Sequence, residues 1–180
     1  VIDQGKSINT SQTLSGNFAF EQLTLTGGGK LVRLAVTNVA LSLGGTPAVV
    51  SITNGNGQFV ISPAGLAGEL AVTVAVNVTG VRFNGGLKLR VNNTTTAVNE
   101  TFAGTTLDAL VLPAGPYLRV EVGTESTPAT LEVVGQTILG SFVLEQTTRP
   151  NGERVVRVGV ANGGLKLGGT NGAPILEVSE

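Results

Sequence analysis

One stretch of this chain occurs twice, and that internal repeat constrains the fold more than any other feature of the sequence. Residues 12–46 read QTLSGNFAFEQLTLTGGGKLVRLAVTNVALSLGGT, and residues 136–170 read QTILGSFVLEQTTRPNGERVVRVGVANGGLKLGGT. The second stretch aligns with the first without a gap, from residue 12 onto residue 136, an offset of 124 residues. Roughly half of the aligned positions are identical, and several others exchange one apolar residue for another. Such self-similarity predicts a structure that repeats as well.

The repeat divides the chain into three parts. Residues 16–139 form one full repeat unit, residues 140–180 open the next one, and residues 1–15 match the tail of a preceding unit. The first residue is Val1 and not methionine, so we expect a processed protein or a fragment. We also expect the parent protein to repeat the unit further in both directions.

Alternation of apolar and polar residues with a period of two dominates the chain and predicts β-strands. In residues 70–78 every second residue is Leu or Val, and the residues between are small or polar. No stretch of a dozen residues has a helical period, and 26 glycines disfavour helix further. We therefore predict an all-β fold, either an elongated β-solenoid or continuous rolled sheet, or alternatively a tandem β-sandwich. The alternation runs through residues 136–146 without a linker, which favours the continuous sheet.

The first half of each copy predicts a β-hairpin. Residues 26–30, TGGGK, and their counterparts 150–154, PNGER, have the composition of tight turns. If the turn is centred on Gly28, Phe20 pairs with Val36, and the apolar side chains of both strands share one face. We expect this face to be the core face.

Recurring residues on both faces of this hairpin give the repeat a signature. Glu21 and Arg33 fall diagonally across the face opposite the apolar one, as do Glu145 and Arg157. A contact of this kind contributes at most about 1 kcal/mol if it is exposed. The signature residues are Phe18, Phe20, Glu21, Gln22, Arg33 and Asn38 in the first copy, and Phe142, Glu145, Gln146, Arg157 and Asn162 in the second.

The phase of the alternation changes inside several apolar runs. The changes fall within residues 36–39, within residues 160–165, and at residues 79–80. Each change predicts a bulge or corner, where a strand bends and keeps its apolar side inward. Residues 54–57, NGNG, lack the acidic residues of a calcium-binding loop and are interpreted as a turn.

The composition leaves few groups for chemistry. The chain has no Cys, His, Met or Trp, so the commonest general base, the strongest nucleophile and the preferred zinc ligands are missing. We therefore expect no enzymatic activity, no metal and no cofactor. The net charge is -1 and no basic stripe is present, which argues against a nucleic-acid partner. The longest apolar run is too short and too polar for membrane insertion as a helix.

Three motifs carry a resemblance to a class of known proteins. They are Gly-x-Phe-x-Phe-Glu-Gln at 16–22, Val-Arg-x-Ala-Val-x-Asn at 32–38, and Pro-Ala-Gly-Leu-Ala-Gly at 63–68. The chain resembles the tandem β-rich repeats of very large bacterial surface proteins, such as adhesins and stalk proteins. The resemblance implies export, an extracellular or cell-surface location, and a role as spacer, stalk or adhesive scaffold. It transfers no functional residues.

Two other functional hypotheses stand beside this one. The chain could be the subunit of a homopolymeric extracellular filament, because the second unit is incomplete and copies of the chain could complete one another by strand addition or end-to-end stacking. It could also be a carbohydrate-binding module with surface glycans as partners. For that role the chain has one tyrosine, Tyr117, and no tryptophan as stacking platforms.

Overall fold

The computed structural model describes residues 12–103, 105–149, 151–168 and 175–179, and every regular element among them is a β-strand. The prediction of an all-β fold is confirmed. No helix among the described residues is long and apolar enough to span a membrane. The strands are β1 (Thr13–Thr24), β2 (Lys30–Leu43), β3 (Val50–Ser62), β4 (Gly65–Val78), β5 (Val81–Asn92), β6 (Val98–Glu100), β7 (Leu110–Leu112), β8 (Tyr117–Val122), β9 (Ala129–Val133), β10 (Gln136–Thr148), β11 (Arg154–Leu167) and β12 (Leu176–Ser179).

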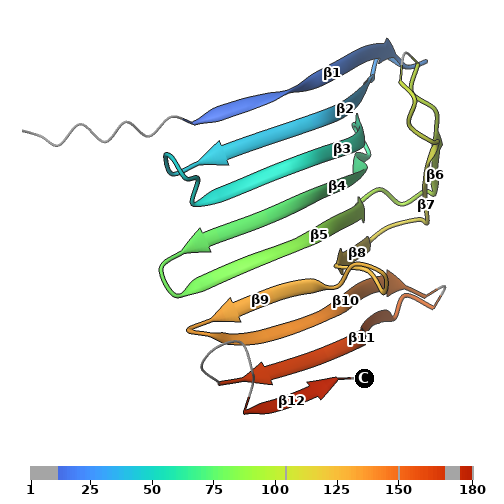
Figure 1. The fold of residues 1–180 in the computed structure, drawn as a ribbon. Helices are drawn as coiled ribbons and strands as arrows, with labels where there is room; N and C mark the ends of the chain where they lie inside the picture. Colours follow the sequence, from blue (N-terminus) through green and yellow to red (C-terminus); the bar gives the residue numbers. More distant parts are fainter. Residues whose placement is uncertain (1–11, 104, 150, 169–174, 180) are drawn as a thin grey trace, which may run out of the picture.

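Ten strands form one large antiparallel sheet (Figure 1). The order is β1-β2-β3-β4-β5, then β8 and β9 together, then β10-β11-β12. β8 pairs with residues 87–92 of β5 and β9 pairs with residues 81–84, so these two short strands share one position in the sheet, end to end. The remaining strands, β6 and β7, pair with each other. The main sheet is a single layer, which differs from the two stacked sheets of the sandwich alternative.

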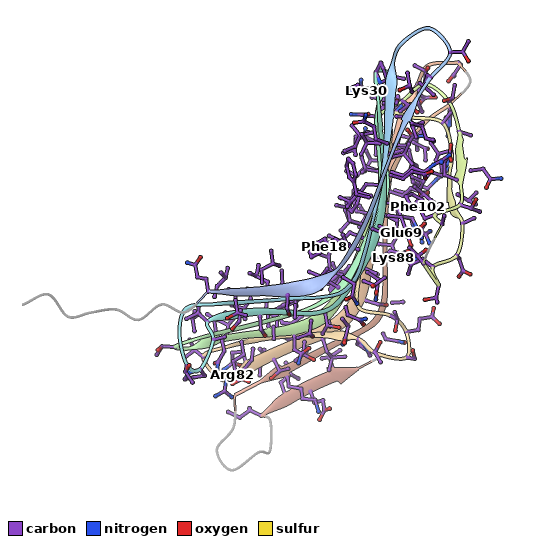
Figure 2. The ribbon with its side chains drawn as sticks, turned by 90° about the horizontal axis from the view of Figure 1, so that it is seen from above. Phe18, Lys30, Glu69, Arg82, Lys88 and Phe102 are labelled. Carbon is purple, nitrogen blue, oxygen red and sulfur yellow. The ribbon has the colours of Figure 1, made fainter. Side chains whose placement is uncertain are left out.

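The main sheet bends halfway along its strands and has an L-shaped profile (Figure 2). In β2 the register with β3 shifts between Val36 and Val39, and Asn38 has a φ of 54°. In β11, Asn162 has a φ of 50° at the matching position. The phase changes predicted within 36–39 and 160–165 are therefore bulges at the bend, as expected. They keep the apolar side chains on one face while the strand turns the corner.

Two other predictions are wrong, the corner predicted from the phase change at residues 79–80 and the turn predicted from the NGNG sequence of residues 54–57. Residues 79–80 form no corner; they are the two-residue turn between β4 and β5, with Val78 paired to Val81 and Gly80 at a φ of 78°. Residues 54–57 form no turn; they lie inside β3, where Asn54 has a φ of 54° and provides the bulge. A bulge within a strand and a turn between two strands can have similar local sequences. The pairing with neighbouring strands decides whether the chain bends or reverses there.

The two faces of the L differ in chemistry. The concave face carries the aliphatic and phenylalanine side chains of alternating positions, and the convex face carries most of the charged ones. Figure 2 shows Phe18 on the concave side and Glu69, Lys88 and Phe102 on the convex side. Residues 93–103 and 105–116, which we call the crossing segment, lie between β5 and β8 in the sequence and over the convex face of one arm (Figure 2). We call this arm the covered arm and the other the open arm.

The buried core lies between the covered arm and the crossing segment, and this corrects the prediction that Phe18 and Phe20 face the core. Phe20 is 68% exposed on the concave face. Ala35 and Ala67 leave room on the convex face for the crossing segment to pack. The buried apolar members of this core are Ala35, Val60, Ala67, Phe102, Leu110, Leu112 and Tyr117.

Asn92 holds both ends of the crossing segment. Its side chain is 0% exposed, and its Nδ2 donates to the carbonyl oxygens of Thr96 at 2.8 Å and Pro113 at 2.7 Å. Its Oδ1 accepts hydrogen bonds from the backbone N of Thr94 at 2.9 Å and from the Thr94 hydroxyl at 2.7 Å. One buried side chain thus satisfies polar groups of the loop that would otherwise be buried without partners.

The two matching stretches of sequence form the same hairpin in the same sheet. Every pairing of β1 with β2 recurs between β10 and β11 at the sequence offset of the repeat, including the register shift. The turns also agree, because Leu25 N donates to Gly29 O at 2.7 Å and Arg149 N donates to Glu153 O at 2.8 Å. β12 then pairs with the end of β11 as the start of β3 pairs with the end of β2.

The register of this hairpin differs by two residues from the predicted one. Phe20 pairs with Leu34 and not with Val36, because the loop is centred on Gly27. A shift of two residues leaves every side chain on its predicted face. It also places Glu21 directly opposite Arg33, where a diagonal contact was predicted, and the second copy repeats this arrangement.

Candidate functional site

The signature residues lie on both faces of the two matching hairpins and do not converge on one pocket. The pairing places the aromatic and glutamine members on the concave face and the charged members on the convex face. The concave members are Phe18, Phe20, Gln22, Phe142 and Gln146; the convex members are Glu21, Arg33, Glu145 and Arg157; Asn38 and Asn162 lie at the bend.

Arg33 joins the first hairpin to the crossing segment. Its guanidinium lies 3.1 Å from Glu21 Oε2 on β1 and 2.5 Å from Glu100 Oε2 on β6. The hydrogen bond to Glu100 raises the pKa of the Arg33 guanidinium above its ordinary value, and the bond to Glu21 adds to the effect. The contact with Glu21 follows from the predicted hairpin, whereas Glu100 is remote in sequence and was not predicted.

A second set of ion pairs crosses the middle of the convex face, and sequence reasoning missed it. Glu69 Oε2 accepts from Arg90 Nε at 2.6 Å, and its Oε1 lies 3.2 Å from Lys88 Nζ. Arg119 Nε donates to Glu121 at 2.5 Å, which raises the pKa of Arg119, and Arg119 Nη1 reaches Glu145 at 3.3 Å. All these residues occupy the phase opposite the aliphatic residues of their strands. This shared phase in the sequence was the signal from which a row of charged residues on one face of the sheet could have been predicted.

The two copies of the Glu–Arg pair have different surroundings. The side chain of Glu145 is 20% exposed because β8 lies beside it and brings Arg119. The side chain of Glu21 is 46% exposed, and its ion-pair partner among the described residues is Arg33. Conversely, Arg33 is 22% exposed and Arg157 is 62% exposed, because the crossing segment covers the first arginine only. Equivalent residues of the two copies thus differ in exposure and in ion-pair partners because different segments lie beside them.

These differences identify two open edges of the sheet. Among the described residues nothing pairs with the outer edge of β1, whereas the same edge of its counterpart β10 pairs with β8 and β9. At the other end β12 covers only residues 164–167 of β11 and leaves the outer edge of residues 154–163 without a described partner. Unpaired strand edges are templates for the addition of another strand.

The concave face of the main sheet is predominantly apolar. Among the described strands of the main sheet, the pairing puts only two charged residues on this face, Lys30 and Arg154, both beside hairpin turns. Exposure of its apolar side chains is greatest near the open edges, and reaches 68% for Phe20 and 69% for Val158. Extensive exposed apolar surface of this kind marks sites of interaction.

Among the described residues, we find no cluster of side chains that forms a better candidate for a functional site than the open edges and the concave face. They contain no group of three or more His, Cys, Asp or Glu that could hold a metal ion. A cavity of about 280 Å³ beside β1 is lined by Ala19, Glu21, Arg33, Ala35 and Phe102 among others, and its two charged groups are paired with each other. The tyrosine Tyr117 is 7% exposed, and this burial raises the pKa of its phenol above 10.0.

Comparison with known proteins identifies no relative of this chain. No protein-family model matches it, and neither a curated protein nor a solved structure does.

Proposed function

We propose that this chain is a structural segment of a longer tandem-repeat protein that acts outside the cell as a spacer, stalk or adhesive scaffold. The observation that supports this most is the identity of the two hairpins: β1–β2 and β10–β11 have the same register, the same bulge and the same turn within one sheet. A second hairpin of this kind is placed to begin a second unit without any break in hydrogen bonding.

The geometry of the sheet gives the proposed unit a length. From β1 to β10 the sheet advances by six strand positions, counting β8 and β9 as one. Neighbouring strands are about 4.8 Å apart, so each unit adds about 29 Å along the direction of stacking. The polar residues of the convex face and the apolar residues of the concave face continue in line from unit to unit.

The test is a chain lengthened by one additional copy of residues 16–139, inserted after residue 139. A continuous sheet gains a unit and its interface, so unfolding stays cooperative and the midpoint in urea rises. Small-angle X-ray scattering is expected to give a particle about 29 Å longer with an unchanged cross-section.

A matched control has the same insertion preceded by a flexible Gly/Ser linker, which uncouples the two units. If the lengthened chain and this control unfold at the midpoint of the original chain, the units are independent domains and the proposal fails.

A second candidate function is a filament built from identical chains, and the open edges of β1 and β11 favour it. The expected result is an average mass that rises with protein concentration in light scattering. A mass that stays at 18.2 kDa across the concentration range would leave the covalent tandem repeat as the better proposal.

The proposed extracellular location rests on the composition and on the resemblance to the tandem repeats of large bacterial surface proteins. The chain has only 13% charged residues and no cysteine or methionine that could be oxidised. Labelling of intact source cells with an antibody against the chain is the direct test. Labelling that requires permeabilised cells would contradict the location and leave the structural role untouched.

The carbohydrate-binding alternative loses its tyrosine platform in the folded chain. Its one expected stacking platform, Tyr117, is buried against the crossing segment. A buried ring presents no face to a sugar.

A further inference from the structure

The partners of β10 indicate which kind of strand could pair with the outer edge of β1. β10 has the sequence and hairpin geometry of β1, and its corresponding edge is occupied. Residues 142–146 of β10 pair with β8, and residues 136–140 pair with β9. The corresponding residues on β1 are 18–22 and 12–16, and among the described residues these have no partner on that side.

We propose that the outer edge of β1 binds an extended segment with the sequence of residues 117–133, supplied by a neighbouring repeat of the same kind. The inference rests on the proposed function for the source of that segment. It adds the identity of the partner, the register of binding and the side chains that select it.

Charge on the convex face supports this partner. On the occupied edge, Arg119 of β8 reaches Glu145 Oε1 at 3.3 Å while Arg157 holds Oε2 at 3.3 Å, so the carboxylate lies between two cations. Glu21 has the equivalent position, and its cation Arg33 also binds Glu100. An arginine placed as Arg119 is placed would give Glu21 a second cation.

Apolar contacts on the concave face select the same segment. Leu118, Val120 and Val122 of β8 extend the aliphatic face beside β10, and Val120 pairs directly with Leu144. Across the same pairings, the segment would lie beside Phe18 and Phe20, which are more exposed than their counterparts on β10. A register slip of one residue would exchange the two faces of the incoming strand. A slip of two residues would keep the faces but would place the equivalent of Tyr117 or Glu121, not of Arg119, opposite Glu21, so apolar contacts and charge together favour one register.

The direct test uses a synthetic peptide of residues 115–135 and the full, isotopically labelled chain. Binding is expected to slow hydrogen exchange at amides of residues 18–22 and to leave the exposed edge of β11 unchanged. A peptide with Arg119→Glu is expected to bind about tenfold more weakly. The chain variant Glu21→Arg is expected to restore binding of that peptide and to weaken binding of the original one.

Cross-linking provides an independent measurement of the register. The chain has no cysteine, so Phe20→Cys in the chain and Val120→Cys in the peptide introduce one thiol each. We expect a disulfide between them under oxidising conditions, and a much lower yield when the peptide carries Arg119→Cys, whose side chain lies on the other face.

The inference is overturned if β1 amides show no protection, if both edges are protected equally, or if charge reversal has no effect. These results would leave the proposed function standing as long as the lengthened chain still forms one longer cooperative particle. Failure of the lengthened chain with intact peptide binding would overturn the proposed function alone.

Discussion

Tyr117 shows how burial determines the chemistry of a single residue. The crossing segment excludes water from its ring, and both this burial and the charge of Glu145 raise the pKa of the phenol. In the folded chain the neutral phenol is favoured. The contribution of this neutral phenol to the free energy of unfolding is fully present below pH 10, and it is lost as pH rises through the raised pKa of Tyr117.

The titration of Tyr117 is directly measurable, because the chain has one tyrosine and no tryptophan. We expect the absorbance at 295 nm to change with a midpoint above pH 10 in buffer, and near pH 10 in urea. Equal midpoints in the two solvents would show that the ring is not buried.

The two copies of the signature arginine allow a matched comparison at the same scale. Arg33 bonds to two carboxylates and is largely covered, whereas Arg157 is mostly exposed and bonds to one. We expect Arg33→Met to lower the free energy of unfolding by about 1–2 kcal/mol, and Arg157→Met to change it by less than about 0.5 kcal/mol. Urea denaturation measures both, and equal losses would contradict the assigned role of Glu100.

At the scale of the element, the bend depends on asparagine residues with left-handed backbone angles. Asn38, Asn54 and Asn162 have φ values of 54°, 54° and 50°. Asparagine tolerates this region better than most residues, and β-branched residues tolerate it poorly. The bend of the sheet is therefore encoded in single positions within long strands.

Replacement of Asn38 tests this reading of the bend. We expect Asn38→Val to destabilise the chain by about 1–3 kcal/mol, and Asn38→Gly to stay within about 0.5 kcal/mol of the original. Thr53→Val on β3 is a suitable control, since Thr53 is exposed, lies beside the bulge and has no positive φ. A loss with Val but not with Gly, measured by urea denaturation, separates backbone strain from loss of the side chain.

At the scale of the whole molecule, the main sheet carries apolar residues on its concave face and most charged residues on its convex face. The crossing segment covers only part of the convex face. The exposed concave face is expected to bind an apolar dye such as ANS in the native state, without partial unfolding. Val158→Lys should lower the dye fluorescence several-fold and change the stability by less than about 0.5 kcal/mol, since Val158 is 69% exposed.

The control for this prediction is Thr53→Lys, which adds the same charge at an exposed position on the convex face. Unchanged dye fluorescence in Val158→Lys would mean that the dye reports another surface. A large loss of stability would mean that Val158 is covered in solution.

Much of the architecture was predictable from local sequence. The alternation specified strands and assigned residues to faces, the glycine-rich turn specified the hairpin, and two of the phase changes marked the bend correctly. The Glu21–Arg33 pair followed from the same pattern. These features depend on residues close in sequence or on the strict period of two of a strand, so no knowledge of distant contacts was needed.

The sequence alone therefore determined that this chain forms long, bent, two-faced strands with a recurring hairpin. Only the tertiary structure decided which face became the core, because that depended on where the crossing segment packed and on Asn92 holding its ends. It also decided that residues 79–80 reverse the chain while residues 54–57 bend it, and that Glu100 reaches Arg33. Burial and strand pairing between segments far apart in the chain are collective properties, and local periodicity contains no information about which partner arrives.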